Sequence, residues 1–229
     1  MTQTMTLEEF LIHLSAVDVG TRTNDLVSWI ISNKTVKGNP LHMVRDLGAR
    51  VFDTIKYEHA YSRIVDLLGA KQTSAFLLNA YRYNADGLAE VEGVLNKHLP
   101  HPSMYGQEEI MLMKANFHNY TALLSKRMSE LLGVDHHHYI PWVKRWCRQS
   151  YEAANIYQEH KLTVVRAAFA FSAAADALFE LQKNGVGNSV LIHQYCNAAL
   201  RLFGDETIPE VAGGVAHVKG IQSKLTSGH

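Results

Sequence analysis

The stretch Arg166–Gly204, RAAFAFSAAADALFELQKNGVGNSVLIHQYCNAALRLFG, decides the fold of this chain. Its first half, up to Lys183, is rich in Ala, Phe and Leu and contains no Gly or Pro, which predicts a buried helix whose small residues let a neighbour approach closely. A second helix follows the turn NGVG, with Asn188 or Ser189 as a suitable N-cap. Gly204 can adopt the left-handed conformation that ends it. The stretch therefore predicts a helical hairpin.

Helix signals recur along the rest of the chain, without a convincing two-residue strand period. Thr6 and Glu9 have the spacing of a capping box. The order Asn39-Pro40 is typical of a helix start, and Gly69 of a helix end. Helices are predicted over residues 7–17, 23–33, 41–56, 57–68, 73–83, 86–98 and 107–132. The expected fold class is all-α, with an irregular helical core.

The expected domain organisation is a helical core over residues 1–204 and a C-terminal arm over 205–229. The proline-bearing segment 98–106, HLPHPSMYG, is the best boundary if the core divides into two lobes. After Gly204, four Gly and weak periodicity favour an extended arm. Its apolar side chains are expected to bury against another subunit, and the core is expected to be complete at Gly204.

The charge balance argues against a simple polyanion binder. Lys plus Arg and Asp plus Glu number 22 each, so the chain has no strong net field. The basic residues are unevenly distributed, because residues 1–120 hold 11 basic and 13 acidic side chains whereas residues 121–204 hold 9 and 6. A mild basic bias therefore lies in the second half.

The cysteine spacing and the hydropathy of the chain both bear on the cellular compartment in which the protein is expected. Cys147 and Cys196 lie in predicted helices without CxxC spacing, which favours buried thiols in a reducing environment. No apolar run reaches membrane-spanning length, and the segment MTQTMTLEEF lacks the character of a signal peptide. We expect a cytosolic protein without a membrane partner.

Motifs for catalysis are missing from the sequence. The consecutive His136, His137 and His138 diverge by about 100° per residue on a helix, so a solvated helix entrance is expected there rather than a metal site. His13 is better explained as a surface partner of Glu9, four residues away. Neither HExxH nor Gly-x-Ser-x-Gly occurs. We expect a binding or structural protein that is not an enzyme and uses no cofactor or metal.

The segment 139–151, YIPWVKRWCRQSY, is the best candidate for a ligand-facing helix. Trp142 and Trp146 share one side of it. The cations Lys144, Arg145 and Arg148 share another. Basic side chains beside aromatic rings suit a groove that follows the backbone of single-stranded nucleic acid. The alternative is that the tryptophans belong to the core and the cations are solvated.

Arg166 and Arg201 both lie in apolar helices, where a guanidinium needs a partner to offset its desolvation. An RNA phosphate is one such partner. Asp176 and Asp205 are structural alternatives, and Asp205 lies four residues after Arg201.

The order Arg-x-Ala-Phe-x-Phe, a short-helix interval and then Arg-Leu-Phe-Gly resembles the C-terminal core of the coat proteins of flexible filamentous plant RNA viruses, potyviruses above all. The residues that carry this resemblance are Arg166, Ala168, Phe169, Phe171, Arg201, Leu202, Phe203 and Gly204. The family has an Asp between the two Phe, where this chain has Ala170. It also has an upstream Arg-Gln dipeptide, for which Arg148-Gln149 is a plausible counterpart. Nucleocapsid proteins of segmented negative-strand viruses share a related helical core.

The resemblance implies a coat or nucleocapsid protein that polymerises into a helical filament on single-stranded RNA, in a virion and in the host cytoplasm. Its expected RNA-binding residues are Lys144, Arg145, Arg148, Arg166 and Arg201, with Trp142 and Trp146 as surfaces for base stacking. A near-zero net charge suits such a subunit, because a strongly cationic one would repel its copies. Two alternatives stay open: a helical-bundle enzyme or small-ligand or metal-binding protein, and a helical adaptor without a ligand.

Overall fold

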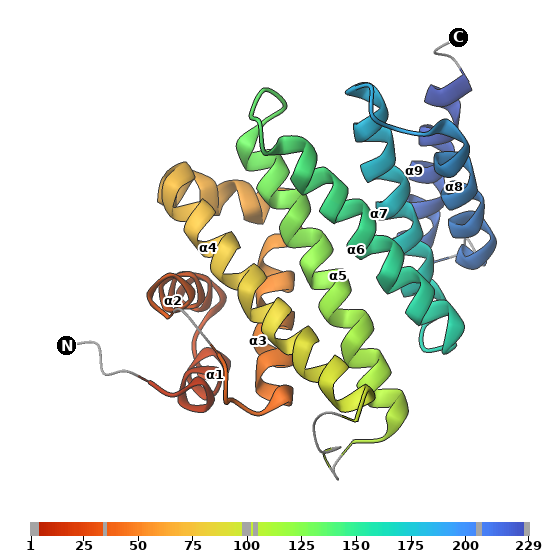
Figure 1. Ribbon diagram of the computed structural model, residues 1–229. Helices are drawn as coiled ribbons and strands as arrows, with labels where there is room; N and C mark the ends of the chain where they lie inside the picture. The colour runs from red at the N-terminus through yellow and green to blue at the C-terminus, as the bar shows by residue number, and fades with distance from the viewer. Residues whose placement is uncertain (1–4, 34–35, 98–101, 103–104, 205–207, 227–229) are drawn as a thin grey trace. The chain divides into compact units, whose positions relative to one another are not determined.

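The computed structural model describes residues 5–33, 36–97, 102, 105–204 and 208–226. Within these ranges the chain forms nine helices and no strand, which confirms the all-α class (Figure 1). It divides into two compact units, Met1–His101 and Pro102–His229. No helix in the described ranges is long and apolar enough to cross a membrane.

The first unit holds four helices: α1 (Leu7–Ala16), α2 (Val19–Ser32), α3 (Leu41–Ile55) and α4 (Glu58–Leu95). The capping box predicted at the start of α1 is confirmed. The backbone N–H of Glu9 donates to the Thr6 hydroxyl at 3.2 Å, and the backbone N–H of Thr6 donates to the Glu9 carboxylate at 2.9 Å. At the start of α3, Pro40 rather than Asn39 is the N-cap.

Helix α4 is longer than the sequence pattern indicates. Gly69 has φ 71° and ψ 165°, so it breaks the helical geometry at the predicted place. Beyond it, the helices predicted over 73–83 and 86–98 form one continuous segment. Asn84, which lies between the two predictions, is buried and donates to the carbonyl of Ala80 within the same helix. This bond satisfies the side-chain N–H group of Asn84 within the helix.

The core of the first unit contains a cluster of aromatic rings. Phe10 stacks on Trp29 with ring centroids 4.7 Å apart, and Tyr83 meets Trp29 edge-on at 6.3 Å. The buried Asn79 amide donates to the carbonyl of Ile30 at 2.9 Å, which joins α4 to the end of α2. Polar bonds at the end of a helix satisfy carbonyls that the helix itself leaves open.

The second unit holds five helices: α5 (Gln107–Leu132), α6 (Tyr139–Glu159), α7 (Val164–Lys183), α8 (Ser189–Phe203) and α9 (Pro209–Thr226). Each of α5 to α8 packs on the helix that follows it in the chain (Figure 1). The predicted hairpin is confirmed as α7 and α8. Asn188 caps α8 by accepting from two backbone N–H groups, and Gly204 ends it with φ 64°.

Alanine lines the core of the second unit. Small side chains cost little entropy in a helix and let helix axes approach closely. Helix α6 contributes Ala153 and Ala154 to this core, and both are fully buried. The buried alanines of α7 are Ala167, Ala168, Ala170, Ala174, Ala175 and Ala177. The composition of the Ala-rich stretch therefore predicts its packing correctly.

The C-terminal segment differs from the extended arm that we expected. Its first residues, 205–207, lie outside the described residues, and 209–226 form helix α9, which packs against α7 and α8 of the same chain. Its buried side chains are Val211, Val215, Val218, Ile221 and Leu225. These positions recur every three or four residues, so burial of one apolar face outweighs the low helix propensity of the glycines.

Candidate nucleic-acid interface

The candidate site lies on the outer face of α6. Helix α6 begins after the turn 133–138, and Pro141 occupies its first turn, where a missing backbone N–H costs nothing. Lys144 and Arg148 lie one turn apart on this helix, and both are exposed. Neither has a hydrogen bond or ion pair with any other described residue.

Trp142 and Trp146 are buried, at 8% and 6% exposure. The Arg145 guanidinium lies 4.7 Å from the centre of the Trp142 ring, and the Lys126 ammonium of α5 lies 5.3 Å from that of Trp146. Cations placed in this way are attracted by the ring quadrupole. The two tryptophans therefore belong to the core and do not present open faces for bases, contrary to the stacking expectation.

Gln149, of the Arg-Gln dipeptide, makes a contact within the protein. Its side-chain oxygen lies 2.7 Å from Nδ1 of His118, a buried residue of α5. The neighbouring Cys147 is a partly buried free thiol, and burial raises its pKa to about 11. At neutral pH this thiol is therefore protonated and unreactive. Of the dipeptide, only Arg148 is free to meet a ligand.

Arg166 lies in a polar cluster with α5 and α6. Oδ1 of the buried Asn116 accepts hydrogen bonds from the Tyr157 hydroxyl at 2.7 Å and from the Arg166 guanidinium at 3.2 Å. Burial raises the pKa of Tyr157, while the Arg166 charge acts in the opposite direction. The partner of Arg166 is thus a neutral amide, and its positive charge is not neutralised by this contact.

Replacing Asn116 with Ala is expected to destabilise the protein by about 1–3 kcal/mol, because the buried Tyr157 hydroxyl loses its acceptor. Tyr157→Phe should cost less, since Asn116 keeps its bond from Arg166. The double variant should be more stable than Asn116→Ala alone, because no hydroxyl is then left unsatisfied. Urea unfolding of the three variants measures this order. A double variant less stable than Asn116→Ala would contradict the assignment of this hydrogen bond.

Arg201 is exposed near the end of α8, and its Nε donates to the carbonyl of Asn197 at 3.3 Å. Asp205, its expected partner, lies outside the described residues. Asp176, the structural partner considered for Arg166, instead contacts His217 of α9. Asp205 had been expected from its spacing four residues after Arg201, whereas the observed partners of Arg166 and Asp176 depend on how the helices pack.

The two motifs that carry the resemblance lie against each other in the structure. They are Arg-x-Ala-Phe-x-Phe on α7 and Arg-Leu-Phe-Gly at the end of α8. The Phe169 ring of α7 approaches the Phe203 ring of α8 edge-on, with centroids 5.0 Å apart. Phe171 is buried and lies among the rings of Tyr151 and Tyr195. Ala170, which replaces the Asp of the resembled family, is 2% exposed. This position therefore belongs to the core and does not line an open pocket.

The histidine-rich turn before α6 brings three imidazoles together. The ring centroids of His137 and His138 lie 3.9 Å apart, and those of His136 and His137 4.5 Å apart. Repulsion from His137 is the main cause that lowers the pKa of His138. Across the described residues, no three His, Cys, Asp or Glu side chains are arranged to hold a metal ion. His13 pairs with Asp25 at 2.6 Å rather than with Glu9.

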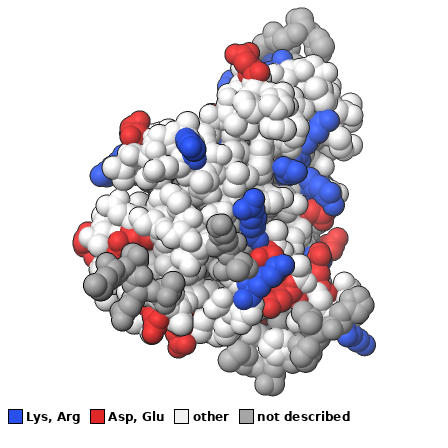
Figure 2. All heavy atoms as spheres, turned by 60° about the vertical axis from the view of Figure 1, so that its left-hand side comes forward, with Lys and Arg blue, Asp and Glu red and all other residues white. Residues whose placement is uncertain are grey.

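The predicted site residues therefore fall into four groups. Lys144 and Arg148 share an open face of α6, and Arg145 lies over the Trp142 ring. Trp142 and Trp146 belong to the core. Arg166 belongs to the Asn116 cluster, and Arg201 lies on α8. The face of the molecule shown in Figure 2 carries both basic (Lys and Arg) and acidic (Asp and Glu) side chains. Comparisons with protein-family models, curated proteins and solved structures find no match to this chain.

Proposed function

We propose that the protein binds single-stranded RNA through the outer face of α6 and assembles on it into a helical nucleoprotein filament. The observation that carries the proposal is the pair Lys144 and Arg148, exposed one turn apart without a partner among the described residues. Two cations on one rigid helix can contact successive phosphates. Such contacts bind RNA without reading its sequence.

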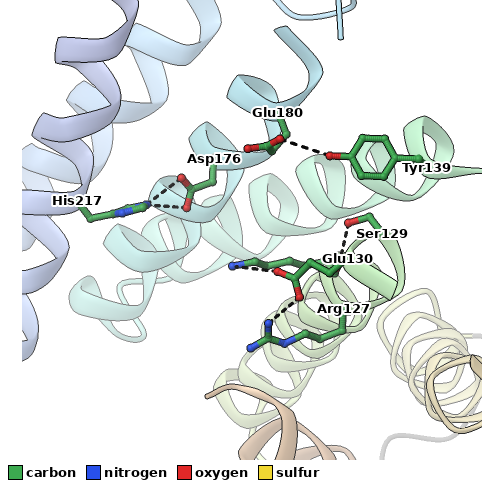
Figure 3. A network of polar contacts seen from close by, with 8 residues as sticks. Arg127, Ser129, Glu130, Tyr139, Asp176, Glu180 and His217 are labelled. Atoms are coloured by element: carbon green, nitrogen blue, oxygen red, sulfur yellow. Dashed lines mark hydrogen bonds and ion pairs between the residues drawn. The ribbon is translucent and has the colours of Figure 1, made fainter. Parts of the chain in front are cut away.

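Several acidic side chains of the neighbouring helices have partners within the protein. Glu130 of α5 pairs with Arg127 and Lys126 (Figure 3). Glu180 of α7 pairs with Lys183 at 2.6 Å, and Asp176 contacts His217. On α6 itself, Glu152 lies one turn after Arg148. An anionic ligand is therefore supported by the two exposed cations themselves and not by a broad positive field.

Self-association is supported by apolar surface at the start of α7. Val164 is 52% exposed, while Val165 and Phe169 are each 40% exposed. Three large apolar side chains within two turns make a patch of the kind that often mediates protein contacts. Zero net charge further allows copies to pack closely, because it limits repulsion between them.

The double variant Lys144→Ala, Arg148→Ala is expected to bind a fluorescein-labelled RNA 20-mer of mixed sequence more weakly than the parent protein does. Each phosphate contact contributes about 0.7 to the slope of log K against log salt for a single strand, so loss of two contacts should flatten the slope by about 1.4. Fluorescence anisotropy between about 50 and about 300 mM salt, a range of about sixfold around physiological ionic strength, measures both quantities.

Lys224→Ala is the matched control, because Lys224 is an exposed lysine of the same unit on α9. Its affinity and salt slope should stay near those of the parent protein. An identical slope in the double variant and the parent would place the RNA contacts away from α6. Absence of any RNA affinity at low salt would overturn the proposed function itself.

Assembly is tested separately on the purified protein. We expect a high ratio of absorbance at 260 nm to that at 280 nm, and filaments in negative-stain micrographs that ribonuclease treatment shortens or dissolves. Discrete particles that bind RNA would limit the function to RNA binding. Nucleic-acid-free filaments would show that assembly is independent of RNA.

A further inference from the structure

Helix α9 is joined to α7 by a polar contact that depends on protonation. Nε2 of His217 lies 2.8 Å from both carboxylate oxygens of Asp176 (Figure 3). Five apolar side chains of α9 are buried, and the Gln222 amide donates to Oδ1 of Asn197 of α8 at 2.9 Å. Protonation of His217 therefore changes the attraction between α9 and α7 without altering the apolar packing.

The charges around His217 come from several helices. Asp176 of α7 is the acidic group that faces it, while Lys126 of α5 and Lys224 of α9 act on it as positive charges. Cys196 of α8 lies near Asp176 as a neutral thiol, because burial raises its pKa to about 11. The hydrogen bond to Asp176 outweighs burial and the two lysines, so the pKa of His217 is raised above its ordinary value.

Helix α9 depends on docking for its own stability. It contains Gly213, Gly214 and Gly220, and glycine is the poorest helix former after proline. An 18-residue helix of this composition is marginal by itself in water. Its helical state should therefore be coupled to its contact with α7 and α8. An element of this kind has a docked and an undocked state, and a single charge can bias the balance between them.

We propose that α9 is a pH-dependent clasp, which the protonated His217 holds on Asp176 of α7 and which loosens when His217 loses its proton. Undocking uncovers the apolar surface of α7 and α8 that the valines, Ile221 and Leu225 of α9 bury. The ring of Phe203 lies against Gly214 of α9, so it becomes accessible in the undocked state. The clasp thereby links pH to the exposure of an apolar surface.

Docking weakens as the pH rises, because His217 binds its proton more tightly in the docked state than in the undocked state. Stabilisation by the pair is complete below the pKa of a free histidine, about 6.5. It is lost as the pH rises through the higher pKa of docked His217. The histidine side chain is 53% exposed, so solvent screens the pair. We expect about a two- to fivefold change in the docking equilibrium, which is the range for exposed ion pairs.

Hydrogen exchange followed by mass spectrometry tests the proposal on the full chain. Peptides that cover 209–226 should exchange about two- to fivefold faster at pH 8.5 than at pH 5.5, relative to intrinsic rates. Peptides from α6 serve as the internal reference for global opening. In His217→Gln and Asp176→Asn this difference between the two pH values should vanish. At pH 5.5 both variants should already show the faster exchange.

His13→Gln is the matched control, because His13 forms a similar pair with Asp25 in the other unit. It should leave the pH dependence of 209–226 unchanged. Equal protection of α9 at both pH values in the parent protein would overturn the clasp. So would a pH dependence that persists in His217→Gln and Asp176→Asn.

Discussion

Ending the chain after Gly204 is expected to leave a second unit that folds but is markedly less stable and prone to aggregate. The truncation removes α9 and uncovers the surface that its five buried apolar residues cover. Burial of each such side chain contributes about 1.5–3 kcal/mol, and the entropy cost of ordering the helix, about 1–2 kcal/mol per residue, offsets much of this gain. The truncated chain should melt at a lower temperature than the full chain and form aggregates, measured by circular dichroism and size-exclusion chromatography.

Ending the chain after Thr226 is the matched control, since it keeps α9 whole. That variant should melt cooperatively, close to the midpoint of the full chain. A Gly204 truncation that stays monomeric and melts as the full chain does would show that α9 is dispensable to the fold. It would also restore the earlier expectation that the core is complete at Gly204.

Gly214→Ala is expected to lower stability by about 1–3 kcal/mol, the usual cost of overpacking a core. A Cβ at this position would lie 2.5 Å and 2.7 Å from two atoms of the Phe203 ring and 3.0 Å from the Phe169 ring. Phe203 is 3% exposed, so its ring has little room to withdraw. Thermal unfolding should show a midpoint several degrees lower.

The neighbouring residue provides a control of opposite sign. A Cβ at Gly213 meets nothing within 4 Å. Gly213→Ala therefore gains helix propensity and should stabilise α9 by up to about 1 kcal/mol. If both alanine variants shift the melting temperature in the same direction, the close contact between Gly214 and Phe203 is not a determinant of docking.

Much of the fold was predictable from helix caps and helix breaks, because each of these sequence signals acts on the backbone within a few residues. The Thr6 capping box, the Gly69 break, the Asn188 cap and the Gly204 stop all occur as expected. The helical hairpin within Arg166–Gly204 is also correct. These features depend on backbone geometry and short-range hydrogen bonds, which the sequence shows directly.

Helix α9 was missed because glycine content was given more weight than periodicity. The spacing of Val211, Val215 and Val218 already follows one face of a helix. Glycine lowers helix propensity in isolation, but Gly214 serves here as the point where two phenylalanine rings approach the backbone. Tertiary packing thus overrides propensity, and the sequence alone does not show which neighbour will pack there.

The candidate site was only partly predictable for a similar reason. Exposure of Lys144 and Arg148 follows from the amphipathic pattern of α6, but that pattern fits buried tryptophans as well as stacking ones. The partners of Arg166 and Asp176 are 50 and 41 residues away along the chain. Contacts at such separations depend on the assembled core, and helical spacing carries no information about them.

The order in which the helices of the second unit pack bears on how fast this unit folds. Helices α5 to α8 each pack on the next one along the chain, and α9 returns to α7 and α8. Contacts that close over short chain separations place a protein among the fast folders, on a timescale of about microseconds to milliseconds. During synthesis α5, α6 and α7 can assemble as they emerge from the ribosome. The surface that awaits α9 is then open until the segment 209–226 has left the ribosome, and during this interval the nascent chain exposes apolar surface through which it can aggregate.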